Sequence, residues 1–537
     1  MFPSLSKLSL HDSVAADQDD SPLFDDVGPP PRRPRLDPPM QQPMQQPMQQ
    51  PVNEPWSVPR MDGSLRLQAH QYGPSLAMKR HFSKHDAPKG VLTYFEVGTG
   101  KTFAALHAAR TFLEWHAKGH VYIITTRANI ETTWSRDWSV YATALNQQQP
   151  GASRRFTRAL EWGTRDAIFK LNMPQDHPIL IIVDEAHLIR NMNSQSAPKL
   201  IDLCAQSAYT ILLTATPMVR TILDANSLLS YIHGKALDEI DQDTSSMRIG
   251  QLFNKALIYK AQDRSQFPRI DQVQKIVTLG DEYGLFAGLD EESIEDLKKG
   301  LTKDHLHGER WNTTIARVAA TRGLPKNPFL VNSRRVCNSE VKFQAILDVM
   351  SQDAQQGIRR MVVYSNFRDE GVDGFFVWLL TKQFRRPGKR TYEYATGTLP
   401  DGTRMEVALW SNENYAALTK WQHNDEPICK VLLISPMARE GLSLRGVRKF
   451  HLMEPSWNIS DEEQAIGRAA RLTSHRHLPA DQQDVTVYHW VATFPGGQTA
   501  DQRVAEMAEL RNRVIQHYLN RVRVVGNNYL TRLISEY

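Results

Sequence analysis

The stretch 91-VLTYFEVGTGKT-102 decides the fold of the first half of the chain. Its apolar start predicts a buried strand, and the periodicity after Thr102 predicts a helix. A strand, a short glycine-containing loop and a helix in this order predict a phosphate-binding loop at Gly98-Thr99-Gly100. Glycines let backbone N–H groups turn toward phosphates, and a helix N-terminus favours negative charge there. We expect Lys101 to reach the β- and γ-phosphates and the Thr102 hydroxyl to ligate Mg²⁺.

A departure from the strict pattern lies at Phe95, where a first glycine would be expected. The loop keeps Gly98 and Gly100 directly before Lys101, so we expect the departure not to remove the phosphate site. The alternative interpretation is a glycine-rich turn without a chemical role.

A second motif, 179-ILIIVDEAH-187, is an apolar run that ends in two carboxylates. A buried strand of this kind places Asp184 and Glu185 at the carboxyl edge of a parallel sheet, where ligands bind. We expect Asp184 to hold Mg²⁺, and Glu185 to orient and deprotonate the attacking water. The alternative is a solvated acidic pair at a helix start, since acids favour helix N-termini.

Hydroxyl groups follow the next apolar run, in 213-LTATP-217. Thr214 and Thr216 at a strand end are candidates for sensing the γ-phosphate and passing its state onward. Threonine-rich turns are common, so this motif alone is weak evidence for a sensing role, and it supports one only together with the other motifs.

The second half of the chain carries 464-QAIGRAAR-471. Gln464, Arg468 and Arg471 are spaced i, i+4 and i+7, which predicts that all three lie on one helix face. Paired arginines suit a transition state whose charge spreads over the γ-phosphate oxygens. The alternative is a solvated basic face, but Gly467 costs a helix about 1 kcal/mol and indicates a close approach.

Upstream, 435-SPMAREGLSL-444 combines small residues with hydroxyls after an apolar run. Glu440, Gly441 and Ser443 are therefore candidates for nucleic-acid contact and coupling, because a phosphodiester backbone can approach them closely. A plain turn is an equal alternative when the segment is viewed alone.

Apolar runs alternate with helical patterns in both halves, which predicts an α/β protein with two tandem parallel sheets flanked by helices. Residues 1–60 hold 13 of the 30 prolines and three Pro-Met-Gln-Gln copies, so they read as a disordered tail. The predicted units, in chain order, are the tail 1–60, a first domain 61–234, a helical insert 235–332, a second domain 333–498 and a helical extension 499–537. In that extension, Val504, Met507, Leu510, Val514 and Tyr518 are expected on one apolar face.

Composition excludes several classes of protein. No stretch approaches the roughly 18 uninterrupted apolar residues of a membrane span. Three widely separated cysteines exclude a disulfide scaffold and a cysteine-based zinc ribbon, and they predict an intracellular, reducing compartment. The net charge is +5, but residues 1–60 carry eight acids and five bases, so the remaining 59 bases and 51 acids give +8.

These motifs, in this order and spacing, resemble those of superfamily 2 helicase-type ATPases of the DEAH-box kind over about residues 62–495. The resemblance implies two RecA-like domains with ATP in the cleft between them and nucleic acid lying across both. It also implies that Gln71 is the adenine-proximal glutamine, and that Ile123–Trp134 and Val362–Phe367 lie on the nucleic-acid side. The segments 453-MEPSWN-458 and 333-SRRVCN-338 are similar to those of Swi/Snf-type translocases and of helicase-like ATPases of large DNA viruses. Those viral proteins include poxvirus-type nucleoside triphosphatase I and the early transcription factor small subunit.

The resulting hypothesis is ATP- and Mg²⁺-dependent translocation on nucleic acid, with DNA favoured over RNA, in viral transcription. A viral protein of this kind would reside in the host cytoplasm or nucleus, or in the virion, with viral RNA polymerase or transcription factor subunits as partners. The alternatives are an RNA helicase and a non-catalytic scaffold of a transcription complex built on an ATPase core. Intact Lys101, Glu185 and Arg471 count against the scaffold, which has no physical need for them.

Overall fold

The computed structural model describes the chain in eleven ranges. They are 67–148, 150–164, 176–280, 283, 330–386, 394–399, 402–410, 421, 428–436, 444–471 and 474–537. The predicted tail 1–60 lies outside them, as do Glu440, Gly441 and Ser443. Within these ranges every helix is too short or too polar to span a bilayer.

The first sheet has six strands, all paired in parallel, in the order β3-β2-β4-β5-β1-β6. Its strands are β1 (Gly90–Phe95), β2 (His120–Ile124), β3 (Leu160–Gly163), β4 (Ile179–Val183), β5 (Tyr209–Thr214) and β6 (Leu257–Lys260). β1, β4 and β5 are buried along their whole length. Such continuous apolar burial is typical of a parallel sheet covered on both faces.

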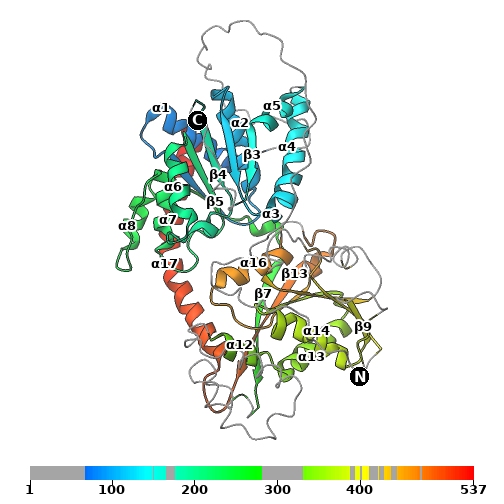
Figure 1. Cartoon of the computed structure of the whole chain (residues 1–537). Helices are drawn as coiled ribbons and strands as arrows, with labels where there is room; N and C mark the ends of the chain where they lie inside the picture. The colour runs from blue at the N-terminus through cyan, green and yellow to red at the C-terminus, as the bar shows by residue number, and fades with distance from the viewer. Residues whose placement is uncertain are drawn as a thin grey trace. The chain divides into compact units, whose positions relative to one another are not determined.

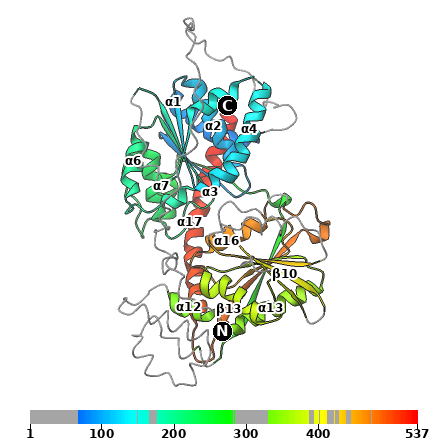
Figure 2. The same cartoon turned by 45° about the vertical axis from the view of Figure 1, so that its right-hand side comes forward.

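Helices cover both faces of this sheet (Figures 1 and 2). α1 (Gly73–Lys84), α2 (Lys101–Trp115), α4 (Ser135–Gln148) and α5 (Ala152–Ala159) contribute to one apolar core, and α6 (Ser196–Gln206) and α7 (Asp224–His233) to the other. A short helix α3 (Arg127–Asn129) and a π-helical turn (Ile130–Trp134) precede α4. The predicted α/β architecture is confirmed.

The second sheet has seven strands in the order β7-β13-β12-β8-β11-β10-β9, and only β9 runs antiparallel. Its strands are β7 (Arg269–Thr278), β8 (Arg360–Tyr364), β9 (Tyr394–Thr398), β10 (Arg404–Leu409), β11 (Cys429–Ile434), β12 (Lys449–Leu452) and β13 (Asp484–Thr493). α13 (Glu340–Gln355) and α14 (Gly374–Thr381) pack into one core of this sheet, and α16 (Ile459–Ala469) packs into the other. α12 (Val331–Cys337) precedes α13.

The predicted helical insert 235–332 is wrong in its described part. It contains α8 (Ser246–Leu252), but β6 belongs to the first sheet and β7 is a ten-residue strand of the second. β6 is too short to stand out as an apolar run. β7 is an edge strand whose side chains are mostly exposed, so it lacks the apolar signal of a central strand.

The C-terminal helix α17 (Ala500–Glu536) covers the predicted extension 499–537, but the predicted apolar face is only partly buried: Val504 is buried. Met507, Leu510 and Val514 are about half exposed, whereas the face centred on Ile515 and Leu519 is buried. Residues of α17 belong to both apolar cores of the first sheet, so the helix packs as part of the first domain. The helix carries two apolar stripes. Which of them packs depends on the surface of the first domain, and the sequence of the helix alone does not show this.

Candidate active site

The glycine-containing loop joins β1 to α2 as the sequence predicts. Gly98 and Gly100 have φ values of +80° and +81°, a left-handed conformation that glycine adopts at little cost. Lys101 is the first residue of α2, and its ammonium donates to the carbonyl of Phe95 at 3.0 Å. Phe95 needs no glycine-like freedom, because it ends β1 with a buried ring packed edge-to-face on His70.

Two side chains of the turn Ala69–Tyr72 lie within hydrogen-bond distance of the backbone of this loop. The amide nitrogen of Gln71 lies 3.4 Å from the Thr99 carbonyl and 3.3 Å from the Gly100 carbonyl. His70 Nε2 lies 2.8 Å from the same Thr99 carbonyl. Gln71, which the resemblance places near the adenine of ATP, thus contacts the backbone of the phosphate loop. His70 contacts the same backbone and was not predicted from the sequence.

Residues of β6 and of the segment between β6 and β7 also contact the loop. The Glu96 carboxylate accepts hydrogen bonds from the Tyr259 hydroxyl at 2.6 Å and from the backbone N–H of Gln262 at 3.0 Å. The Gln262 side chain donates to the Val97 carbonyl at 3.0 Å. A Cβ on Gly98 would lie 2.6 Å from the ring of Phe267. The connection between the two sheets therefore touches the phosphate loop directly.

Asp184 and Glu185 follow β4 at the carboxyl edge of the first sheet, as predicted. Asp184 Oδ2 accepts a hydrogen bond from the Trp134 indole at 2.8 Å and another from the Thr125 hydroxyl at 3.0 Å. Burial, and to a lesser extent the neighbouring Glu185 carboxylate, raises the pKa of Asp184 above its usual range. Burial lowers the pKa of Lys101, while Glu185 and then Asp184 oppose that shift, so the ammonium faces both carboxylates.

His187 links the carboxylates to the third motif. Its Nδ1 lies 3.4 Å from the Glu185 carboxylate and 3.3 Å from the Thr214 hydroxyl oxygen, which in turn accepts from the Thr216 N–H at 3.0 Å. Burial lowers the pKa of His187 to about 4, so the imidazole is neutral at pH 7. These contacts join the predicted catalytic carboxylate to both predicted sensing threonines.

The arginines of the second domain are not all on one helix face, which corrects the prediction. Gln464 and Arg468 lie on α16, but the helix ends at Ala469 and Arg471 follows it. The Arg471 guanidinium folds back to donate to the Gly467 carbonyl at 3.3 Å. A Cβ on Gly467 would meet no described atom within 4 Å, so no described protein group makes the predicted close approach.

Arg471 nevertheless acts electrostatically on the first-domain site. Burial, with a smaller contribution from the nearby charges of Arg468 and Arg136, lowers its pKa to about 9, and the Glu185 carboxylate opposes the shift. The positive charge of Arg471 in turn lowers the pKa of Lys101. An arginine with a pKa near 9 stays cationic at neutral pH.

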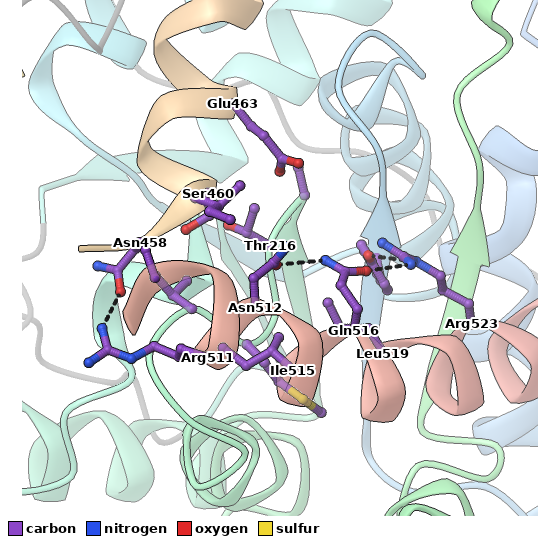
Figure 3. Close-up of a pocket in the computed structure, with 16 residues that line it drawn as sticks. Thr216, Asn458, Ser460, Glu463, Arg511, Asn512, Ile515, Gln516, Leu519 and Arg523 are labelled. Atoms are coloured by element: carbon purple, nitrogen blue, oxygen red, sulfur yellow. Dashed lines mark hydrogen bonds between the residues drawn. The ribbon is translucent and has the colours of Figure 1, made fainter. Parts of the chain in front are cut away.

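A pocket lies behind the Thr214–Thr216 motif, lined by that loop, the start of α16 and one side of α17 (Figure 3). In it, Arg511 donates to the Asn458 side chain at 3.0 Å, and Arg523 donates to the Tyr94 hydroxyl at 3.0 Å. α17 thus joins residues near the second-domain arginines to the strand that carries the phosphate loop.

Oxygen ligands suit Mg²⁺, which is usually held by one or two carboxylates, waters and substrate phosphates. Asp184 and the Thr102 hydroxyl at the start of α2 supply that chemistry. The residues therefore fit a Mg²⁺–nucleotide complex.

Two parallel sheets, a phosphate loop, strand-end carboxylates and an arginine beyond α16 define a two-domain, RecA-like nucleoside triphosphatase. Family comparisons agree: residues 64–219 match the model described as type III restriction enzyme, res subunit, and residues 341–473 match the helicase conserved C-terminal domain. The chain is a superfamily 2 helicase-like NTPase of the kind found in large DNA viruses. Proteins of this family use nucleotides and bind nucleic acid.

Relatives in large DNA viruses extend over most of the chain. A protein of Acanthamoeba polyphaga mimivirus named as an ATP-dependent RNA helicase is 25% identical over 87% of this chain and 100% of its own length. Nucleoside triphosphatase I of Choristoneura fumiferana entomopoxvirus is 20% identical over 82% of this chain and 76% of its own. A termination factor NPH-I homolog of African swine fever virus is 35% identical over 12% of this chain and 9% of its own.

Proposed function

We propose that the chain hydrolyses ATP with Mg²⁺ and uses the energy to translocate along nucleic acid, with double-stranded DNA as the favoured polymer. The observation that carries the proposal is the arrangement at the carboxyl edge of the first sheet, where Lys101 begins α2 after the glycine-containing loop and Asp184 and Glu185 follow β4. The Glu185 carboxylate also opposes the lowering of the Arg471 pKa, so a cation of the second domain lies within electrostatic reach of this edge, as hydrolysis linked to domain closure requires. Viral transcription is the proposed process, with viral RNA polymerase or transcription factor subunits as partners.

In this proposal each residue has a defined role. Lys101 and the N–H groups of Gly98–Thr102 bind the β- and γ-phosphates, and Thr102 and Asp184 hold Mg²⁺. The bound metal ion neutralises phosphate charge. Glu185 orients the attacking water and accepts its proton.

Arg468 and Arg471 stabilise the charge that spreads over the γ-phosphoryl oxygens in the transition state. The contact of His187 with Glu185 and Thr214 supplies a physical route from the hydrolysis site to Thr216 and to the pocket lined by α16 and α17. Hydrolysis and domain movement are linked along that route.

The choice of DNA rests on the sequence resemblance to Swi/Snf-type translocases and to the helicase-like ATPases of large DNA viruses. The relative named as a termination factor homolog supports a role in viral transcription. The relative named as an RNA helicase favours RNA as the second candidate. Cores of this kind contact phosphates more than bases, so ATPase turnover should be measured with single- and double-stranded DNA and RNA at several salt concentrations. Preferential stimulation by RNA would overturn the choice of DNA.

The catalytic proposal is tested by ATPase turnover, with and without DNA, of wild type, Lys101→Ala and Glu185→Gln. We expect losses of about a hundredfold or more, because a general base alone contributes about 10²–10⁴ in rate. The exposed Lys118→Ala and Glu114→Gln serve as matched charge controls. Turnover that stays at the control level in both site variants would refute the assignment.

Partner binding needs a separate measurement. Capture of polymerase or transcription factor subunits by the full chain should persist in Glu185→Gln, since that change leaves the surface of the protein intact. If nothing from the viral transcription machinery is captured by either protein, the proposed process is wrong even where hydrolysis is right.

A further inference from the structure

A single oxygen of the proposed metal-binding carboxylate is held by two side chains from outside its own motif. Asp184 Oδ2 accepts hydrogen bonds from Trp134 Nε1 at 2.8 Å and from Thr125 Oγ1 at 3.0 Å. The Trp134 side chain is fully buried and Thr125 is 4% exposed. The backbone N–H of Asp184 also donates to the Ile124 carbonyl at 2.8 Å, so the carboxylate is fixed to the end of β2.

The chemistry of these donors restricts the orientation of the carboxylate. An indole N–H can only donate, and a buried one needs an acceptor. Hydrogen bonds to a charged group are about twice as strong as those between neutral groups. With Oδ2 occupied by two donors, Oδ1 is the oxygen that remains for a ligand, and among the described residues its donor is the adjacent Glu185 N–H at 3.0 Å.

The local backbone explains how Trp134 reaches Asp184. Trp134 ends the π-helical turn Ile130–Trp134, and the Ser135 hydroxyl donates to the Ile130 carbonyl at 2.6 Å. One extra residue in a turn rotates the following side chains by about 100° relative to a regular helix. π-helical turns are rare and often occur at functional sites. The Trp162 ring packs edge-to-face on Trp134 with centroids 5.3 Å apart.

We propose that Trp134, with Thr125 as its companion donor, is a positioning residue that orients Asp184 for Mg²⁺–nucleotide binding. This inference rests on the proposed function, in which Asp184 ligates Mg²⁺. It assigns a role to the segment that leads from β2 into α4, because movement of that segment changes the orientation of the carboxylate.

The test measures binding of a fluorescent ATP analogue by the full chain as a function of Mg²⁺ concentration, and again in EDTA. Trp134→Phe keeps an aromatic ring and removes one donor, and Thr125→Val removes the other with little change of shape. Loss of an outer-sphere partner typically weakens metal binding about 10–100-fold. We expect each variant to raise the Mg²⁺ midpoint about tenfold, to leave binding in EDTA unchanged, and to recover turnover at high Mg²⁺.

Trp162→Phe is the matched control, because it alters the same aromatic pair and leaves both donors to Asp184 in place. A midpoint for Trp134→Phe or Thr125→Val equal to that of Trp162→Phe would overturn the proposal. An equal loss of binding with Mg²⁺ and in EDTA would do the same, since it indicates a purely structural role. If Trp134→Phe fails to fold, Thr125→Val decides the question alone.

Failure of the proposed function gives a different pattern. If Lys101→Ala and Glu185→Gln turn over ATP at the control level, the proposed hydrolysis site itself is refuted. If those two variants lose turnover while the donor variants Trp134→Phe and Thr125→Val keep the Mg²⁺ midpoint of wild type, only the positioning role is refuted.

Discussion

The ammonium of Lys342 in α13 lies 2.6 Å from the carboxylate of Asp501 in the first turn of α17, and neither side chain is exposed to solvent. Lys342 also donates to the Met453 carbonyl at 3.0 Å, and the same Asp501 oxygen accepts the Ala492 N–H at 3.0 Å. These contacts tie the start of α17 to the second sheet, while the rest of the helix packs on the first.

Lys342→Met is expected to lower the free energy of unfolding by about 3–5 kcal/mol, because it leaves the Asp501 charge buried and unpaired. Urea denaturation followed by circular dichroism measures the change. The matched control is Arg513→Met, which removes an exposed pair with Glu509 and is expected to cost less than about 1 kcal/mol. Equal costs for the two variants would contradict the buried-pair argument.

A second prediction concerns Gly526, where α17 crosses β6. A Cβ there would lie 2.1 Å from Leu257 Cδ2 and 3.0 Å from the Tyr259 backbone nitrogen. Alanine favours a helix by about 1 kcal/mol over glycine, but overpacking costs about 1–3 kcal/mol. We therefore expect Gly526→Ala to lower the melting temperature. Gly467→Ala, which meets no described atom within 4 Å, should leave it unchanged or raise it, and the reverse order would show that close packing of α17 is not the cause.

The nucleotide-binding core was predictable from sequence because its signals are local. The loop around Lys101 and the Asp184–Glu185 pair each follow an apolar run directly, so strand, turn and chemistry are adjacent in the chain. The fold class followed from the same runs. The individual roles of these residues remain predictions.

What sequence reasoning missed depends on contacts between distant segments. Trp134 reaches Asp184 through a π-helical turn that periodicity does not reveal. Arg471 leaves the helix at Ala469, so its i+7 spacing from Gln464 did not define a common face. β7 is paired on one side only by described strands, and its exposed, largely polar sequence carries no apolar run.

The third prediction concerns acid stability and depends on His451. This imidazole is fully buried, accepts a hydrogen bond from the Trp490 indole at 3.2 Å, and has its pKa lowered to about 3 by burial and then by Lys449. In the unfolded chain a histidine pKa lies near 6.5, so between about pH 6.5 and 3 the unfolded state binds more protons. Stability is therefore complete above about pH 6.5 and falls as the pH drops through this window.

Denaturation at pH 7.5 and pH 5 measures this loss. His451→Gln keeps an acceptor without a titrating ring, so its stability should differ less between the two pH values than that of wild type. The exposed His85→Gln is the control and should behave as wild type does. An unchanged pH dependence in His451→Gln would assign the acid sensitivity to other groups.

The last prediction separates nucleotide binding from hydrolysis at Arg471, and it rests on the proposed function. Arg471→Gln removes the second-domain cation that acts on Lys101 and Glu185. An arginine that stabilises a γ-phosphoryl transition state is worth about 10³–10⁵ in rate, so kcat should fall about a thousandfold while the Kd of a fluorescent ATP analogue changes only a few-fold. Arg471→Lys keeps the charge but loses the planar fork, so its kcat should lie between the two. The exposed Arg476→Gln is the control. If Arg471→Gln and Arg476→Gln share the same kcat, Arg471 has no part in hydrolysis, and its attraction to the Glu185 carboxylate serves domain packing instead.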